Sequence, residues 1–126
     1  MPDVPGVPVI DVDEAARRLR ESPGPAGAAP LLVDVRESNE FASVRIPGAV
    51  LMPLSEFQAS YQRLPKDRPL FLHCAVGKRS LVAAELLKRN GYEDVANVEG
   101  GIVAWQKAGH PIRQGPADPG EGELEG

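Results

Sequence analysis

Short apolar runs alternate with amphipathic segments from Val7 to Gly109, and this alternation limits the fold more than any other feature of the sequence. The apolar runs have the length of strands and are rich in β-branched residues; they are residues 7–12, 31–35, 49–53, 70–74 and 95–98. Helical spacing marks the segments between them, at residues 13–21, 38–44, 54–64, 79–90 and 101–109. Because the strands are continuously apolar, the pattern predicts a mainly parallel, five-stranded sheet with helices on both faces.

Local signals and composition divide the chain. Asp13 and Ser38 are candidate N-caps, and Gly91 follows Asn90 as a helix stop. One domain is predicted over residues 9–112, after a short lead-in at residues 1–8. Residues 21–30 are expected to form a connecting loop. Pro, Gly and Glu dominate residues 113–126, so this acidic tail is expected to be disordered.

The overall charge excludes some classes of partner. The 126 residues carry a net charge of -4 from mixed charges, with 5% aromatic residues and no basic stripe, so nucleic acid is not an expected partner. The start of the chain lacks the pattern of a signal peptide, and no apolar run has the length of a membrane span. We therefore expect no membrane partner and a cytoplasmic protein that acts on something small.

Cys74 is the only cysteine, which excludes an internal disulfide, a CxxC pair and a thiolate zinc cluster. It lies at the carboxyl end of a predicted strand, where parallel α/β folds place their chemistry. The next four residues must turn tightly before a helix that begins near Lys78 or Arg79. Their N–H groups would converge on the sulfur, and Gly77 suits a turn that needs a positive φ. Thiols in such positions titrate at roughly 3.5 to 7.5 instead of about 8.5, so a thiolate is expected.

The residues of this stretch also have more ordinary interpretations. Most free cysteines are small buried hydrophobes. Here the strand end, the glycine-containing turn and the two cations together favour a reactive thiol. Strand alternation points His73 away from Cys74, which favours a structural role. Ser80 either assists the sulfur through its hydroxyl or satisfies backbone groups at the helix start.

Four stretches together resemble a single-domain rhodanese, a thiosulfate sulfurtransferase-like protein, over about Val9 to Ile112. They are "LLVDVRESNEF", "RIPGAVLMPL", "CAVGKRS" and "NGYEDVANVEGGIVAWQKAGHPI". The resemblance implies a three-layer α/β/α fold in which Cys74 takes a sulfane sulfur from thiosulfate and passes it, as a persulfide, to cyanide or a thiol. It implies no metal or organic cofactor. The substrate-binding residues it implies, with Lys78 and Arg79 attracting the anionic donor, are Ala75, Val76, Gly77, Lys78, Arg79 and Ser80.

The resemblance also assigns supporting residues. Asp34 and Arg36 match the family's D-x-R turn, which we interpret as a salt-bridged support of the loop together with Glu40. Trp105 matches "GG-x-x-x-W" and is read as core packing. The family usually has Gly-His before "IPGA", whereas this chain has Val44 and Arg45, so donor recognition is expected to differ from the family's.

Two alternatives to a free sulfurtransferase stay open. Phosphatases of related fold place five residues between the cysteine and the arginine, but four separate Cys74 from Arg79 here. This smaller ring suits a terminal sulfur better than a phosphate, and leaves a phosphatase or arsenate reductase as a minor alternative. A sulfur relay or binding module that meets a protein acceptor uses the same cysteine. The sequence does not indicate the natural donor, the acceptor or the oligomeric state.

Overall fold

A computed structural model describes residues 6–21 and 29–124 of the chain. Its main sheet has five strands, all paired in parallel, in the order β1-β6-β5-β2-β4. The strands are β1 (Val9–Ile10), β2 (Leu31–Asp34), β4 (Val50–Leu51), β5 (Leu70–His73) and β6 (Val95–Val98). The helices are α1 (Val12–Arg20), α2 (Ser38–Ser43), α3 (Leu54–Ser60), the 3-10 helix η2 (Tyr61–Arg63), α4 (Lys78–Arg89) and α5 (Gly101–Lys107).

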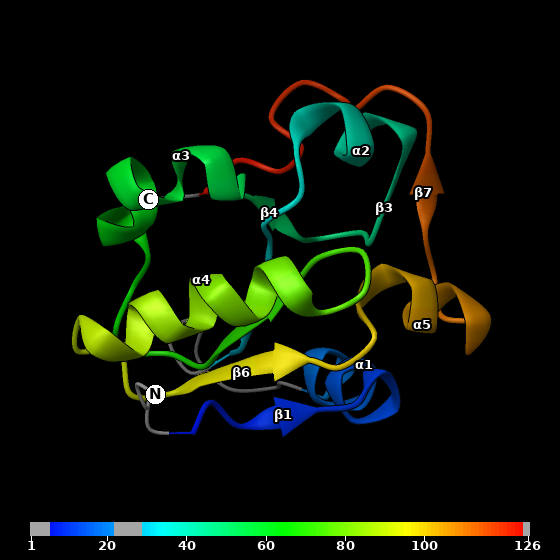
Figure 1. Ribbon diagram of the computed structural model, residues 1–126. Coiled ribbons are helices and arrows are strands. Elements are labelled where there is room, and N and C mark those ends of the chain that lie inside the picture. Colours follow the sequence, from blue (N-terminus) through cyan, green and yellow to red (C-terminus); the bar gives the residue numbers. More distant parts are fainter. Residues whose placement is uncertain (1–5, 22–28, 125–126) are drawn as a thin grey trace.

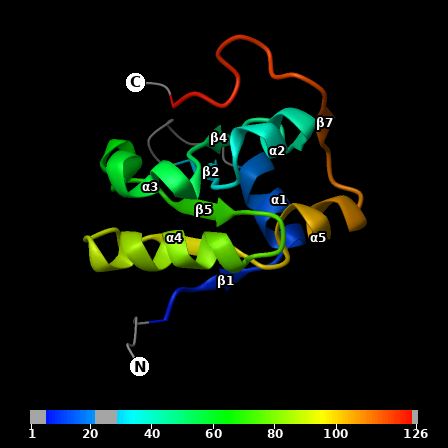
Figure 2. The ribbon, with the colours of Figure 1, turned by 45° about the horizontal axis from the view of Figure 1, so that its top comes forward.

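Helices cover the sheet on both faces, with α3 and α4 on one side and α1 and α5 on the other (Figures 1 and 2). Side chains alternate between these layers along β5. Leu70 and Leu72 pack in the cluster that contains Leu87 of α4, whereas Phe71 packs in the cluster that contains Trp105 of α5. Burial on both faces explains why the strands are continuously apolar. The three-layer α/β/α fold predicted from the sequence is confirmed.

Trp105 lies in the core, as expected. Its side chain is buried, and its indole Nε1 donates a hydrogen bond to the Pro111 carbonyl oxygen over 2.7 Å. This bond satisfies the one polar atom of the ring where the chain leaves α5.

Two helix starts differ from the sequence expectation. Asp11, not Asp13, caps α1, and its side chain accepts a hydrogen bond from the Glu14 N–H over 2.8 Å. Glu37 stands at the cap position of α2 and forms a capping box with Glu40. In both cases two polar residues lie close together in the sequence, and the earlier one occupies the N-cap position. Gly91 follows α4 with a φ of 89°, as its stop signal predicts.

The C-terminal segment (residues 113–124), for which composition predicts disorder, makes specific contacts with the domain. β7 (Arg113–Gln114) pairs antiparallel with β3 (Val44–Arg45), and these two strands form a second, small sheet. Farther on, the Gly122 carbonyl accepts a hydrogen bond from the Leu51 N–H of edge strand β4 over 2.7 Å. Residues 1–5 of the predicted lead-in, 22–28 of the predicted loop, and 125–126 lie outside the described residues.

Arg45 also binds this segment. Its side chain is 1% exposed, and its Nε and Nη2 atoms donate to the Glu121 carboxylate over 2.6 and 2.9 Å. A third guanidinium nitrogen donates to the Gly115 carbonyl oxygen. A buried guanidinium needs such partners, and the C-terminal segment supplies them. Composition counts apolar residues and therefore does not reveal a segment that is held by strand pairing and by a buried cation.

None of the helices in the described ranges is long and apolar enough to cross a membrane.

The ion pair between Arg45 and Glu121 should hold the C-terminal segment in place. Glu121→Gln leaves the buried guanidinium without a carboxylate, and we expect the melting temperature to fall by at least about 3 °C. Limited proteolysis should also cleave residues 113–124 faster in this variant. Glu123→Gln, at an exposed position two residues on, is the matched control. Equal melting temperatures and cleavage rates for the two variants would contradict this role.

Candidate active site at the carboxyl edge of the sheet

Cys74 lies directly after β5, at the carboxyl edge of the sheet and before the start of α4. Gly77 precedes α4 at its N-cap position, with φ 101° and ψ 0°. This left-handed conformation costs little for glycine and brings the chain around the sulfur within three residues. The predicted strand–turn–helix arrangement is therefore present, with α4 beginning at Lys78.

Hydrogen-bond donors surround the sulfur atom. The Gly77 N–H donates to Cys74 Sγ over 3.1 Å, and the N–H and the hydroxyl of Ser80 each lie 3.4 Å from it. The Cys74 residue is 1% exposed, so the sulfur lies at the bottom of the turn. The loop that carries these donors runs from Ala75 to Ser80, and these hydrogen bonds to the sulfur come from Gly77 and Ser80.

These donors favour the thiolate. Burial raises the pKa of the Cys74 thiol, but hydrogen bonds from the Ser80 hydroxyl and from the N–H groups of Ser80, Gly77 and Val76 lower it by more. The pKa therefore lies below its usual value. The start of α4 adds positive potential in the same direction.

Helix α5 turns the loop so that its N–H groups face the sulfur. The Ile102 N–H donates to the Cys74 carbonyl oxygen over 2.9 Å, and the Val103 N–H donates to that of Ala75 over 3.1 Å. Contact this close requires glycine at position 101, because a Cβ atom there would lie 2.2 Å from the Cys74 carbonyl oxygen. The pair Gly100-Gly101 stands out in the sequence, but its contact with the loop does not.

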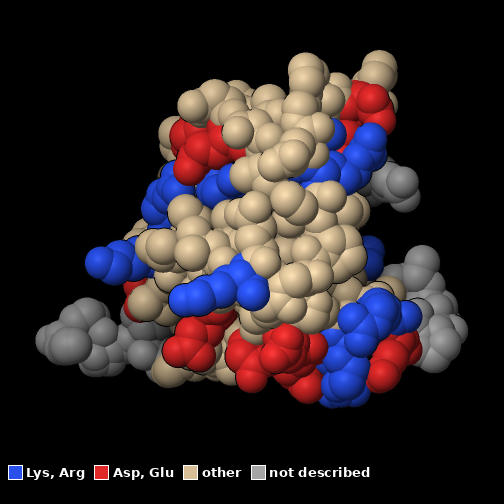
Figure 3. Space-filling model, turned by 90° about the vertical axis from the view of Figure 1, so that its right-hand side faces the viewer, with Lys and Arg blue, Asp and Glu red and all other residues tan. Residues whose placement is uncertain are grey.

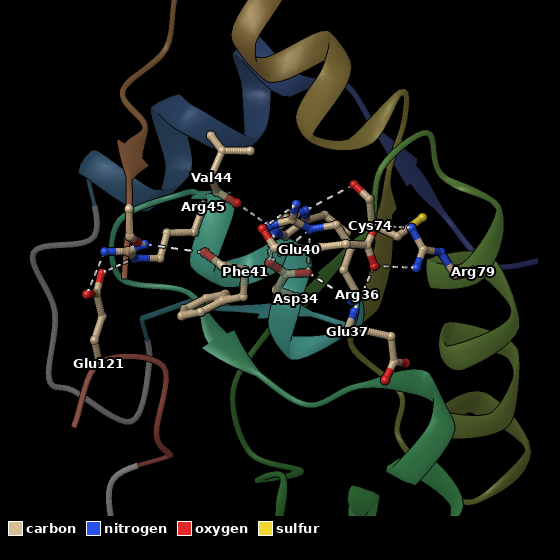
Figure 4. A network of polar contacts seen from close by, with 12 residues as sticks. Asp34, Arg36, Glu37, Glu40, Phe41, Val44, Arg45, Cys74, Arg79 and Glu121 are labelled. Atoms are coloured by element: carbon tan, nitrogen blue, oxygen red, sulfur yellow. Dashed lines mark hydrogen bonds and ion pairs between the residues drawn. The ribbon is translucent and has the colours of Figure 1, made fainter. Parts of the chain in front are cut away.

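A brace of charged side chains supports the loop from β2 and α2 (Figure 4). Asp34 and Arg36, both buried, form an ion pair at 2.8 Å, and Arg36 also donates to the Val44 carbonyl oxygen over 2.7 Å. The Glu40 carboxylate accepts two hydrogen bonds from Arg79, over 2.8 and 2.9 Å. Asp34, Arg36 and Glu40 thus lie together beside the loop.

The two cations expected to attract a donor differ in environment. Hydrogen bonding from Arg79 lowers the pKa of Glu40 to about 2, so this carboxylate stays charged and neutralises Arg79 at ordinary pH. Lys78 is exposed. The charge available to an incoming anion therefore comes mainly from Lys78, whereas Arg79 ties the start of α4 to α2.

His73 contacts the backbone of Cys74. Its Nδ1 lies 3.3 Å from the Cys74 carbonyl oxygen, and its Nε2 lies 3.5 Å from Asp34. Complete burial lowers the pKa of His73, against the opposing influence of Asp34, so the ring is neutral near pH 7. This placement fits the structural role expected from strand alternation.

Asn97 of β6 was not identified from the sequence. Its amide nitrogen donates to the Gly77 carbonyl oxygen over 3.1 Å, and its amide oxygen accepts from the Ser80 hydroxyl over 2.6 Å. The one available signal is a polar residue inside the apolar run "VANV".

Arg45, which stands where the family usually has histidine, faces away from the sulfur. In Figure 4 its side chain extends towards Glu121, on the opposite side of α2 from Cys74 and Arg79. Val44 contributes a backbone carbonyl to Arg36. These two residues therefore support the fold and the brace. Within residues 6–21 and 29–124, no cluster of three or more His, Cys, Asp or Glu side chains is arranged to hold a metal ion.

Comparison with known proteins gives a consistent group of relatives. The sequence pattern of the family described as "Rhodanese-like domain" matches residues 11–108. A "Sulfurtransferase" of Allochromatium vinosum is 36% identical over 103 residues, which cover 82% of this chain and 92% of that protein. A rhodanese-related protein of Thermoplasma volcanium has a similar crystal structure, with a TM-score of 0.74 and 28% identity over 84% of this chain and 97% of that one.

Some relatives are much longer than this chain. The "Probable adenylyltransferase/sulfurtransferase MoeZ" of Mycobacterium tuberculosis is 40% identical over 82 residues. The match covers 64% of this chain but 21% of that protein.

The donors around Cys74 predict a thiol that ionises more easily than in the unfolded chain. The pH dependence of alkylation by iodoacetamide should have its midpoint below about 8.5 in the folded protein and near that value in urea. Between the two midpoints the unfolded chain binds more protons, so the free energy of unfolding should rise with pH over that window. The same midpoint in both states would show that the loop does not act on the sulfur.

Gly101 gives a test of the contact between α5 and the loop. Gly109 also has a positive φ, 83°, but nothing lies within 4 Å of the Cβ position there. Gly109→Ala should cost only the left-handed strain of about 1–2 kcal/mol. Gly101→Ala should cost about 1–3 kcal/mol more through crowding against the loop, and should slow Cys74 alkylation at neutral pH. Similar stabilities and alkylation rates for the two variants would contradict the proposed contact.

Proposed function

The chain belongs to the family of rhodanese-like domains, and we propose that it transfers a sulfane sulfur from thiosulfate, or from a persulfide donor, to cyanide or a thiol through a persulfide on Cys74. One observation carries the proposal. The sulfur of Cys74 is surrounded by N–H donors of a turn at the start of α4, which is a site for a negatively charged sulfur species.

The first step would load the cysteine. The Cys74 thiolate attacks the outer sulfur of thiosulfate, a new S–S bond forms, and the bond to the sulfonate sulfur breaks with its electron pair, which releases sulfite. The negative charge then lies on the terminal sulfur. The N–H groups of Gly77 and Ser80 already converge on Cys74 Sγ, so a charge that forms one bond away meets donors that need little reorganisation.

The second step would unload it. A cyanide or thiolate acceptor attacks the terminal sulfur, and the S–S bond to Cys74 breaks to regenerate the thiolate. Asp34, Arg36 and Glu40 contact no reacting atom in this scheme and hold the loop in position. Lys78 attracts the anionic donor. The atoms and charges of both steps balance without a metal or an organic cofactor.

A protein acceptor is a second candidate for the unloading step, and exposed apolar side chains favour it. Val76 in the loop and Val103 in α5 are 55% and 52% exposed, and the Val103 N–H binds the loop itself. Figure 3 shows this edge of the molecule, where uncharged residues form most of the middle and Lys and Arg side chains lie beside them.

The free cysteine nucleophile suits a reducing compartment, and we propose the cytoplasm.

Mass spectrometry of the intact protein tests the persulfide. Thiosulfate should add the mass of one sulfur atom, and cyanide should remove it with formation of thiocyanate. Cys74→Ser should neither gain that mass nor turn over, because no other thiol is present. Thiocyanate formation at the wild-type rate by Cys74→Ser would overturn the proposal. Turnover of an aryl phosphate by the wild type, without sulfur loading, would favour the phosphatase alternative.

Lys78 gives a test of donor attraction. Lys78→Ala should raise KM for thiosulfate about two- to fivefold with little change in kcat, since one exposed charge contributes at most about 1 kcal/mol. Added salt should weaken the wild type more than the variant. Lys88→Ala, in the last turn of the same helix, is the control and should leave KM unchanged. An unchanged KM for Lys78→Ala at low ionic strength would exclude this role.

A further inference from the structure

The Ser80 hydroxyl lies between two groups that both accept hydrogen bonds. Its Oγ is 2.6 Å from Asn97 Oδ1 and 3.4 Å from Cys74 Sγ. All three side chains are buried. A hydroxyl carries a single hydrogen, so Ser80 donates to only one of the two at a time.

The orientation of the Asn97 amide decides which bond is made. Its Nδ2 donates to the Gly77 carbonyl oxygen over 3.1 Å, and rotating the amide would place two oxygen acceptors against each other there. Oδ1 must therefore face Ser80. At 2.6 Å a hydrogen lies between the two oxygens, and Ser80 is the one that carries it. While this bond is made, a lone pair of the Ser80 hydroxyl faces the sulfur, and the hydroxyl stabilises the Cys74 thiolate only when it turns away from Asn97.

We infer that Asn97 is a positioning residue for Cys74, because its amide oxygen competes with the sulfur for the hydrogen of the Ser80 hydroxyl. A Cys74 thiol donates its S–H to Ser80 and leaves the bond to Asn97 intact. A bare thiolate needs the Ser80 hydrogen for itself, and the hydroxyl must turn away from Asn97. Ionisation of Cys74 therefore costs the bond between Ser80 and Asn97.

The inference deepens the proposed function and rests on it in one respect, that Cys74 is the nucleophile. In the persulfide the negative charge lies on the terminal sulfur and no longer on Cys74 Sγ, the atom that the Ser80 hydroxyl faces. The hydroxyl then stays on Asn97. The amide oxygen thus disfavours the bare thiolate without opposing the loaded cysteine.

The charged groups that surround the sulfur in the wild type are unchanged in every variant. Asn97→Asp adds one carboxylate, but it is present both with and without Ser80→Ala, so its direct influence cancels when the effect of Ser80→Ala is taken within that background. Helix α5 contributes backbone N–H groups to the loop, and β6 contributes the uncharged Asn97. The ionisable groups on the other elements around the loop are Lys78 and Arg79 of α4, Glu40 of α2, Asp34 of β2, Arg36 after it, and His73 of β5.

The experiment is a double-mutant cycle read out on the Cys74 thiol. Iodoacetamide alkylation as a function of pH gives the Cys74 pKa, and it needs no sulfur donor. Ser80→Ala is made in three backgrounds, which are the wild type, Asn97→Leu and Asn97→Asp. Both Asn97 substitutions remove the donor to Gly77, but only Asn97→Asp keeps an oxygen acceptor for Ser80. Comparing Asn97→Leu with Asn97→Asp therefore separates the effect of competition for the Ser80 hydrogen from the effect of a loosened turn.

In the Asn97→Leu background, Ser80→Ala should raise the Cys74 pKa by at least about half a unit more than it does in the wild type, because the Ser80 hydroxyl is then free to donate to the thiolate. In the Asn97→Asp background the rise should be no larger than in the wild type. An equal rise in all three backgrounds would overturn the inference, as would Asn97→Asp behaving like Asn97→Leu.

Circular dichroism checks that each variant folds. If Asn97→Leu does not fold, the Asn97→Asp arm decides alone: a rise larger than that of the wild type overturns the inference, and an equal or smaller one supports it. Failure of the proposed function is separate. It would appear as the absence of sulfur loading by mass spectrometry, whatever the alkylation profiles show.

Discussion

The site depends on the hydrogen bonds from the start of α5 to the carbonyl groups of Cys74 and Ala75. A peptide group that points its oxygen towards α5 points the next N–H the other way, towards the sulfur. Gly101 makes this possible, because any side chain at that position would collide with the loop. The sheet supplies the place for the cysteine, α4 supplies the helix start, and α5 determines which way the turn between them faces.

The charged brace on the other side of the loop has a different task. The pair of Asp34 and Arg36 is buried and closes the turn after β2, and Glu40 carries the connection to Arg79 at the start of α4. A buried ion pair is weak evidence for stability but fixes a geometry well. The loop is thus held through its carbonyls by α5 and through a side chain by α2. A preorganised ring of donors needs both constraints, because an anion is stabilised only by N–H groups that already face it.

Features that depend on short-range sequence patterns could be predicted from the sequence, whereas features that depend on contacts between distant residues could not. The layers and the parallel sheet followed from apolar periodicity, and the turn at Cys74 followed from a strand end, Gly77 and two cations within six residues. Asn97 lies 17 residues from Ser80 and gave no signal beyond one polar residue in a strand. The C-terminal segment is bound in part through the pair of Arg45 and Glu121, which are 76 residues apart. Neither contact can be read from composition or spacing.

The central claim is that the loop from Ala75 to Ser80 holds a sulfur anion on Cys74, and amide NMR of the protein tests it most directly. On addition of thiosulfate the backbone N–H signals of this loop, above all those of Gly77 and Ser80, should shift and then return when cyanide is added. Amides of α3 and of the C-terminal segment should stay in place. Loading of sulfur with unchanged loop signals, or shifts confined to another part of the molecule, would contradict the claim.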